Sequence, residues 1–131
     1  MPPLPFSAIQ NMIGLPTSYF CAETCSDAAT QEGFEAIFAN EELKAIEECG
    51  ELYPYAREML QSIRQTGITM AICSNGSRIY LDHACAHTGI TEFFSIIDCE
   101  HVGTTKSEAA AKLLKRLGAK GGFLVGDRAL D

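Results

Sequence analysis

Apolar residues change their spacing near residue 51, and this change predicts two regions with different secondary structure. Before it, apolar residues recur at helical spacing while Glu fills the outer positions: Phe34, Ile37, Phe38, Leu43, Ile46 and Cys49. Gly14 and Pro16 indicate a turn near the start. Residues 1–51 are therefore predicted to be helical.

Beyond residue 51, helical patterns alternate with short apolar runs. A helix is predicted to begin near Pro54, with an apolar stripe and a C-terminal Gly67: Ala56, Met59, Leu60 and Ile63. Residues 68–73 then read as a strand buried on both faces. The predicted order continues with a helix to His87 that ends at Gly89, a strand over 93–97, a helix over 106–117 that ends at Gly118, and a strand over 122–125.

Strands that alternate with helices in this way indicate β-α-β units and a parallel sheet, so the predicted class is α/β. The stretch 50–54 is the expected junction between a helical region, 1–51, and an α/β region, 52–131. The ligand site of such a sheet is expected beyond the carboxyl ends of its strands.

Composition and charge exclude several classes of function. The 131 residues are 47% hydrophobic and 21% charged, as in a soluble globular domain. The net charge of −7 comes from residues 1–51, where nine acidic residues face one Lys. This argues against nucleic-acid binding, which requires a basic surface. Neither a membrane-spanning run nor a signal peptide is visible, so we expect a cytoplasmic protein with no membrane partner.

Six cysteines are many for this length, yet none forms a C-x-x-C motif. Cys73 lies in an apolar run, and Cys21 and Cys25 would share one face of a helix. We therefore expect reduced thiols that pack as small hydrophobic side chains.

The first candidate site follows the strand that ends at Cys73. Ser74, Asn75 and Gly76 supply a hydroxyl, an amide and a backbone N–H before a helix whose N-terminus favours an anion. The alternative is an ordinary polar turn in which Ser77 caps the helix.

The second candidate is Lys106. Thr105 and Glu108 have the spacing of a capping box, which puts Lys106 at the first helical position. The helix dipole disfavours a cation there by about 0.3–1 kcal/mol, which suggests an anionic partner such as a phosphate. The alternative is an exposed, solvent-screened lysine.

The third candidate is the acidic pair Asp127 and Asp131, which follows the apolar run 122–125. Carboxylates at this spacing can hold Mg²⁺, although Asp127 could also be only a turn or cap residue. Together the three places supply the anion binders, cation and metal ligands that phosphoryl transfer requires.

These residues resemble motifs II, III and IV of the haloacid dehalogenase-like hydrolases: Ile-Cys-Ser74, then Lys106 before a helix, then Val-Gly-Asp127-Arg-Ala-Leu-Asp131. The resemblance implies a Rossmann-like core with a helical cap, here residues 1–51. It also implies that Ser74 and Lys106 bind the transferred phosphate of a small phosphorylated substrate. Asp127 and Asp131 would bind Mg²⁺, which favours the phosphatase branch over the metal-free dehalogenases.

Two further stretches are similar to phosphoglycolate phosphatases. Leu52-Tyr53-Pro54 looks like their cap-to-core junction, and Ile13-Gly14-Leu15-Pro16 looks like part of their cap. Phosphoglycolate is therefore the leading substrate by resemblance, ahead of pyrophosphate, nucleotides and sugar phosphates.

The chain departs from this family in one respect, because it has no apolar strand that ends in D-x-D to supply the nucleophile. Asp27 lies in a polar helical region, Asp82 lies in a predicted helix, and Asp98 follows the strand of a different β-α unit. We expect the chain to be a fragment, truncated at both ends, that lacks the first and last core strands and has no covalent phosphatase activity. The missing first strand would lie between strands 68–73 and 122–125, which must otherwise pair with each other or keep free edges.

Two other functions remain open. The protein could bind a phosphorylated ligand without hydrolysing it or serve as a partner module. It could also bind zinc through residues of ligand type: His83, Cys85, His87, Cys99 and His101. The sequence leaves the oligomeric state undetermined.

Overall fold

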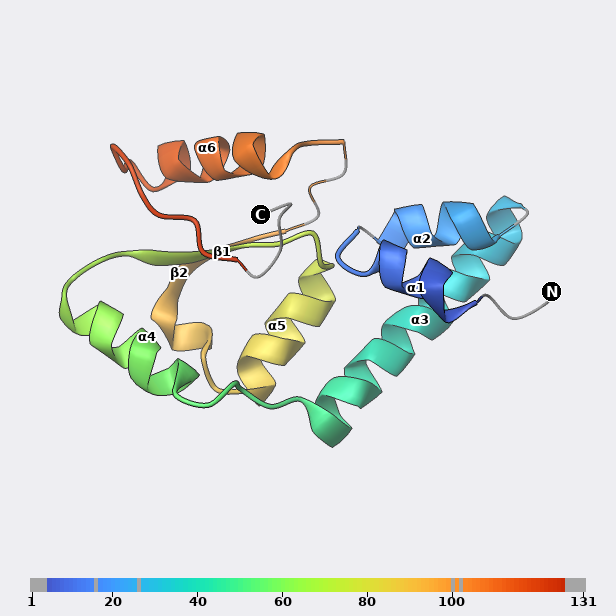
Figure 1. The fold of residues 1–131 in the computed structure, drawn as a ribbon, viewed down its shortest axis with the longest axis horizontal. Helices are drawn as coiled ribbons and strands as arrows, with labels where there is room; N and C mark the ends of the chain where they lie inside the picture. The colour runs from blue at the N-terminus through green and yellow to red at the C-terminus, as the bar shows by residue number, and fades with distance from the viewer. Residues whose placement is uncertain (1–4, 16, 26, 100, 102, 127–131) are drawn as a thin grey trace.

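The computed structural model describes residues 5–15, 17–25, 27–99, 101 and 103–126 (Figure 1). Its N-terminal part consists of the helices α1 (Phe6–Met12), α2 (Thr17–Thr24) and α3 (Ala28–Cys49). The predicted helical character of this region is confirmed for the described residues. The predicted turn lies at Gly14, whose φ of 86° is accessible to glycine without strain.

Helix α3 is the long element of this part, and local hydrogen bonds fix both of its ends. The carboxylate of Asp27 accepts a hydrogen bond of 2.8 Å from the backbone N–H of Thr30, and the N–H of Gly50 donates to Ile46 O at 2.8 Å. Its predicted apolar face is only partly buried. Ile37 is 65% exposed and Cys49 is exposed. Helices α2 and α5 pack on α3 and leave the rest of its surface to solvent.

The α/β part contains α4 (Ala56–Gln65), β1 (Met70–Cys73), α5 (Arg78–His87), a 3-10 turn η1 (Thr91–Phe93), β2 (Phe94–Asp98) and α6 (Lys106–Arg116). Strands β1 and β2 are parallel, as predicted, and Ile72 pairs with Ile97. Helix α6 lies on one side of the strands, and α4 and α5 lie on the other (Figure 1). The architecture is α/β, an incomplete Rossmann-like core.

Two predicted boundaries in the α/β part are wrong. Helix α4 begins at Ala56 rather than near Pro54, because Tyr55 has a left-handed φ of 66° that interrupts the helical backbone. Strand β1 begins at Met70, two residues later than predicted, and Ile68 is 62% exposed. The side chains of β1 are half-buried rather than fully buried, because the sheet has two strands in the described residues.

The predicted strand over residues 122–125 is also wrong. Residues 121–126 are described, but they form no ladder, and the side chains of Phe123 and Val125 are almost fully exposed. A strand needs a neighbouring edge for its N–H and C=O groups, and in the described chain β1 pairs with β2 alone. Residues 68–73 and 122–125 therefore do not pair with each other. Of the two expected outcomes, the one observed is that the strand edge stays unpaired.

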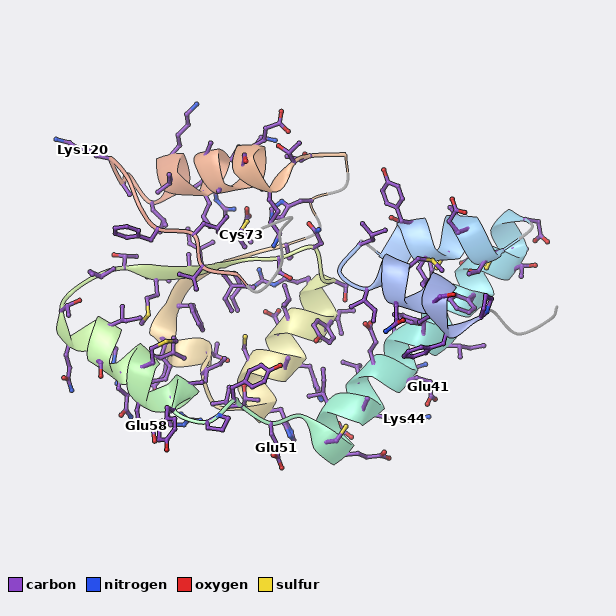
Figure 2. The ribbon with its side chains drawn as sticks, viewed as in Figure 1. Glu41, Lys44, Glu51, Glu58, Cys73 and Lys120 are labelled. Carbon is purple, nitrogen blue, oxygen red and sulfur yellow. The ribbon has the colours of Figure 1, made fainter. Side chains whose placement is uncertain are left out.

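The core of the α/β part lies between the helices and the sheet. Its buried side chains come from four helical elements: Leu60, Leu81, Cys85, Phe93, Ala109 and Leu113. Arg57 ties the start of α4 to the end of α5, because its guanidinium donates to Thr88 O and, at 2.9 Å, to Gly89 O. Charged side chains such as Glu41, Lys44 and Glu58 lie on the outside (Figure 2).

All six cysteines are in the described residues, and none of them forms a disulfide. Cys21 and Cys85 are buried, as expected for thiols that pack as hydrophobic groups, whereas Cys49 is exposed. Among the described helices, none combines the length and apolar character needed to cross a membrane.

Candidate functional site

The loop after β1 is shaped by its own hydrogen bonds. The N–H of Ser74 donates to Asp98 O at 2.9 Å, and Ser74 Oγ accepts from Gly76 N at 3.2 Å. Ser77 Oγ accepts from Tyr80 N at 3.2 Å, so Ser77 caps α5, as the alternative interpretation of this loop expected. A Cβ at Gly76 would lie 3.1 Å from Tyr80 Cδ1, so the loop has room only for glycine there without displacement.

The start of α6 is fixed by the predicted capping box, which is confirmed. Thr105 Oγ1 accepts from Glu108 N at 3.2 Å, and a Glu108 carboxylate oxygen accepts from Thr105 N at 2.9 Å. Lys106 is the first helical residue. Burial raises the pKa of the Cys73 thiol; the positive charge of Lys106 offsets part of this rise, and the negative charge of Asp98 adds to it.

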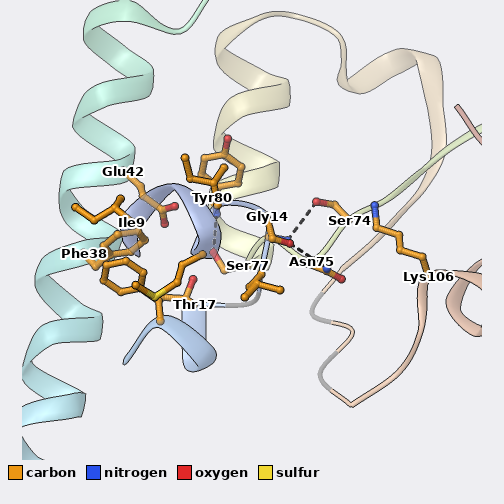
Figure 3. A pocket seen from close by; sticks show the side chains of 15 residues that line it. Ile9, Gly14, Thr17, Phe38, Glu42, Ser74, Asn75, Ser77, Tyr80 and Lys106 are labelled. Atoms are coloured by element: carbon orange, nitrogen blue, oxygen red, sulfur yellow. Dashed lines mark hydrogen bonds between the residues drawn. The ribbon is translucent and has the colours of Figure 1, made fainter. Parts of the chain in front are cut away.

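A cavity of about 670 Å³ opens between the N-terminal helices and this loop (Figure 3). Its volume is within the range of about 300–1,000 Å³ that small-molecule sites occupy. Four of the predicted site residues line it: Ser74, Asn75, Gly76 and Lys106. Asp127 and Asp131 lie outside the described residues, so their predicted role as Mg²⁺ ligands stays a prediction.

The opposite wall of the cavity comes from the N-terminal helices and is mostly apolar: Ile9, Met12, Ile13, Leu15, Phe20 and Phe38. The two walls meet where Asn75 Nδ2 donates to Gly14 O at 3.2 Å. Figure 3 shows Glu42 of α3 at the end of the cavity away from Lys106. Burial raises the pKa of the Glu42 carboxyl above its ordinary value.

Sequence reasoning assigned residues 1–51 to a cap but did not identify the side chains of this second wall. The spacing of Ile9, Met12 and Ile13 on one helical face was a usable signal. Glu42 gave none, because it is one of several acidic residues on α3 and its neighbours along the chain do not distinguish it.

The aspartates in the described residues are occupied elsewhere. Asp27 caps α3, Asp82 Oδ2 accepts from Arg78 Nε at 2.8 Å, and the carboxylate of Asp98 is paired with Arg116. None of them lines the cavity. No described aspartate is therefore placed to act as a nucleophile in this cavity.

The candidate zinc ligands do not converge. His83 Nε2 lies 3.3 Å from Glu47 Oε1 of α3, whereas His101 Nε2 lies 3.5 Å from Cys73 Sγ. The described part of the chain contains no group of three His, Cys, Asp or Glu side chains that could share a metal ion. The zinc hypothesis therefore gains no support from the described residues.

Comparison with known proteins identifies the family of this chain. The sequence matches the family model of the haloacid dehalogenase-like hydrolases over residues 20–131. The chain belongs to the haloacid dehalogenase-like hydrolase family. No curated protein and no solved structure matches it.

The haloacid dehalogenase-like match includes the polar wall of the cavity together with Phe20, Phe38 and Glu42 of the opposite wall. The α1 residues of that wall precede the matched region. Both the loop after β1 and the start of α6 thus belong to the part of the chain that is characteristic of the family.

Proposed function

We propose that this haloacid dehalogenase-like protein binds phosphomonoesters and that Ser74, Asn75, Gly76 and Lys106 bind the phosphate group. The observation that supports this most is the position of these four residues, from two separate elements, on one cavity. A phosphate there would accept hydrogen bonds from the hydroxyl, the amide and the ammonium group. It would also offset the unfavourable placement of Lys106 at a helix N-terminus.

In the same proposal Asp127 and Asp131 bind Mg²⁺. Both are carboxylates, the hard oxygen donors that this ion prefers, and they are four residues apart in the sequence. The described residues offer no competing metal-binding group of three. When bound, the ion would neutralise negative charge on the phosphate.

We further propose that the 131-residue chain binds phosphomonoesters without hydrolysing them through a covalent aspartyl intermediate. The sequence has no apolar strand that ends in D-x-D, and the three described aspartates are engaged in other contacts. A nucleophile is required for covalent catalysis, whereas binding requires only the phosphate-facing residues. Phosphoglycolate is the substrate that the sequence resemblance suggests and serves as the reference compound.

The test is calorimetric titration of the chain with inorganic phosphate, with Lys106→Ala and Lys112→Ala as matched variants. Both remove one positive charge from α6, but only Lys106 lines the cavity. Loss of the charged hydrogen bond should weaken phosphate binding about tenfold in Lys106→Ala. Lys112→Ala should bind as the unchanged chain does.

Equal affinities in the two variants, or no phosphate binding at all, would refute the proposed site. The catalytic part is tested separately with p-nitrophenyl phosphate and Mg²⁺. Release of p-nitrophenol above the protein-free rate would contradict the proposal that this chain does not turn over its ligand.

A further inference from the structure

The cavity has two ends of different chemistry. Ser74, Asn75 and Lys106 occupy one end, and Ile9, Phe38 and Glu42 occupy the other (Figure 3). If the proposed phosphate site is correct, the apolar end faces the group esterified to that phosphate. The residues at the apolar end therefore influence which leaving group the cavity accepts.

The apolar wall favours a leaving group with a sizeable hydrocarbon body. Ile9, Ile13 and Leu15 are 37%, 60% and 42% exposed, so a ligand that covers them would remove apolar surface from water. Phe20 and Phe38, whose ring centroids lie 5.5 Å apart, add aromatic surface to the same wall. The glycolate part of phosphoglycolate has too little carbon to cover these side chains.

Glu42 adds a charge requirement. It is half-buried in the cavity wall and makes no hydrogen bond or ion pair with the other described residues. A protonated amine on the ligand would pair with this carboxylate, and a ligand carboxylate would be repelled by it.

The charges of the remaining lining residues support the same choice. Among the described residues that line the cavity, Lys106 is the single cationic side chain, and it lies at the phosphate end. A ligand with a second negative charge beyond its phosphate would meet Glu42 rather than a cation.

We infer that the cavity takes a phosphomonoester whose leaving group has an apolar body and ends in a protonated amine. This inference rests on the proposed phosphate site. It replaces phosphoglycolate, the substrate suggested by resemblance, with a zwitterionic, largely apolar compound.

The experiment titrates the chain with four probes: inorganic phosphate, phosphoglycolate, 4-ethylphenyl phosphate and 4-(2-aminoethyl)phenyl phosphate. The aminoethyl compound should bind about tenfold more tightly than its ethyl analogue, because the two differ in the amine that faces Glu42. The ethyl compound should in turn bind more tightly than phosphoglycolate.

Glu42→Gln should abolish the advantage of the amine, so that the aminoethyl and ethyl compounds bind with the same affinity. Glu41→Gln is the matched control, because Glu41 is on the same helix but is exposed, pairs with Lys44 at 2.6 Å and does not line the cavity. It should behave as the unchanged chain. Circular dichroism of both variants verifies that α3 is intact.

The outcomes separate the two proposals. If phosphate binds and its binding depends on Lys106, but phosphoglycolate binds as tightly as the aminoethyl compound, the inference about the leaving group is overturned and the phosphate site stands. An unchanged preference for the amine in Glu42→Gln also overturns it. If inorganic phosphate does not bind at all, the phosphate site fails and the leaving-group inference fails with it.

Discussion

The α/β part and the N-terminal helices use their apolar side chains differently. The α/β part contributes most of the buried hydrophobic residues: Leu60, Leu81, Cys85, Phe93, Ala109 and Leu113. Among the described side chains, the N-terminal helices contribute Cys21 and Ile46 to that set, and they leave Phe6, Tyr19 and Ile37 more than half exposed. The α/β part therefore buries its apolar side chains in a core, whereas the N-terminal helices expose much of theirs to the cavity and to solvent.

Described contacts between the two regions run from α3 to α5 and from the loop after α1 to the loop after β1. Helices α3 and α5 pack together, Glu47 lies 3.3 Å from His83, and Asn75 donates to Gly14 O. Contacts between two parts of one chain leave room for relative motion unless their interface is large and apolar. We therefore expect substitutions in the α/β core to affect the whole fold, and substitutions at the contact to affect only the N-terminal helices.

The largest effect is expected from Phe93→Ala. Phe93 is 5% exposed, and the guanidinium carbon of Arg64 lies 4.6 Å from its ring centroid, so truncation leaves a cavity and removes a cation–π contact. The free energy of unfolding should fall by about 3–5 kcal/mol, measured by urea denaturation. Ile79→Ala, at a side chain that is 67% exposed, should change it by less than about 0.5 kcal/mol. Similar losses in both variants would show that the α/β part lacks the core described.

A smaller and local effect is expected from Asn75→Ala. This change removes the 3.2 Å hydrogen bond to Gly14 O, which is worth about 1 kcal/mol. Amide hydrogen exchange should become faster in α1, while the amides of α6 keep their protection. Equally faster amide exchange in α1 and α6 would mean that the two regions unfold as one unit. This result would contradict the proposed difference between the N-terminal helices and the α/β part.

The smallest effect is a pH dependence confined to the start of α6. Hydrogen bonds from the backbone N–H and the hydroxyl of Thr105 hold the pKa of Glu108 below its ordinary value of 4.5. A lowered folded-state pKa stabilises the helix above the ordinary value, and this contribution is lost as the pH falls through the folded-state pKa. The amides of residues 105–109 should therefore lose protection below pH 4.5, and Glu108→Gln should remove this dependence. An unchanged pH response in Glu108→Gln would exclude the capping box as its cause.

Several parts of the fold could be predicted because their causes are local. The capping box of Thr105 and Glu108 and the cap at Ser77 depend on residues within three positions of one another. Gly67, Gly89 and Gly118 have positive φ after α4, α5 and α6, as their positions in the sequence predicted. The parallel pairing of β1 and β2 also followed from the alternation of helices and strands.

The sequence by itself determined the α/β class, the C-terminal ends of α4, α5 and α6 and the residues that stand at the ends of predicted strands, because these depend on nearest neighbours along the chain. Tertiary structure decided that residues 122–125 remain unpaired, since a strand exists only with a partner edge. It also decided that Glu42 lines the same cavity as Ser74 and Lys106. These side chains are far apart in sequence. The packing of α3 against α5 and of α6 against β1 brings them to one cavity.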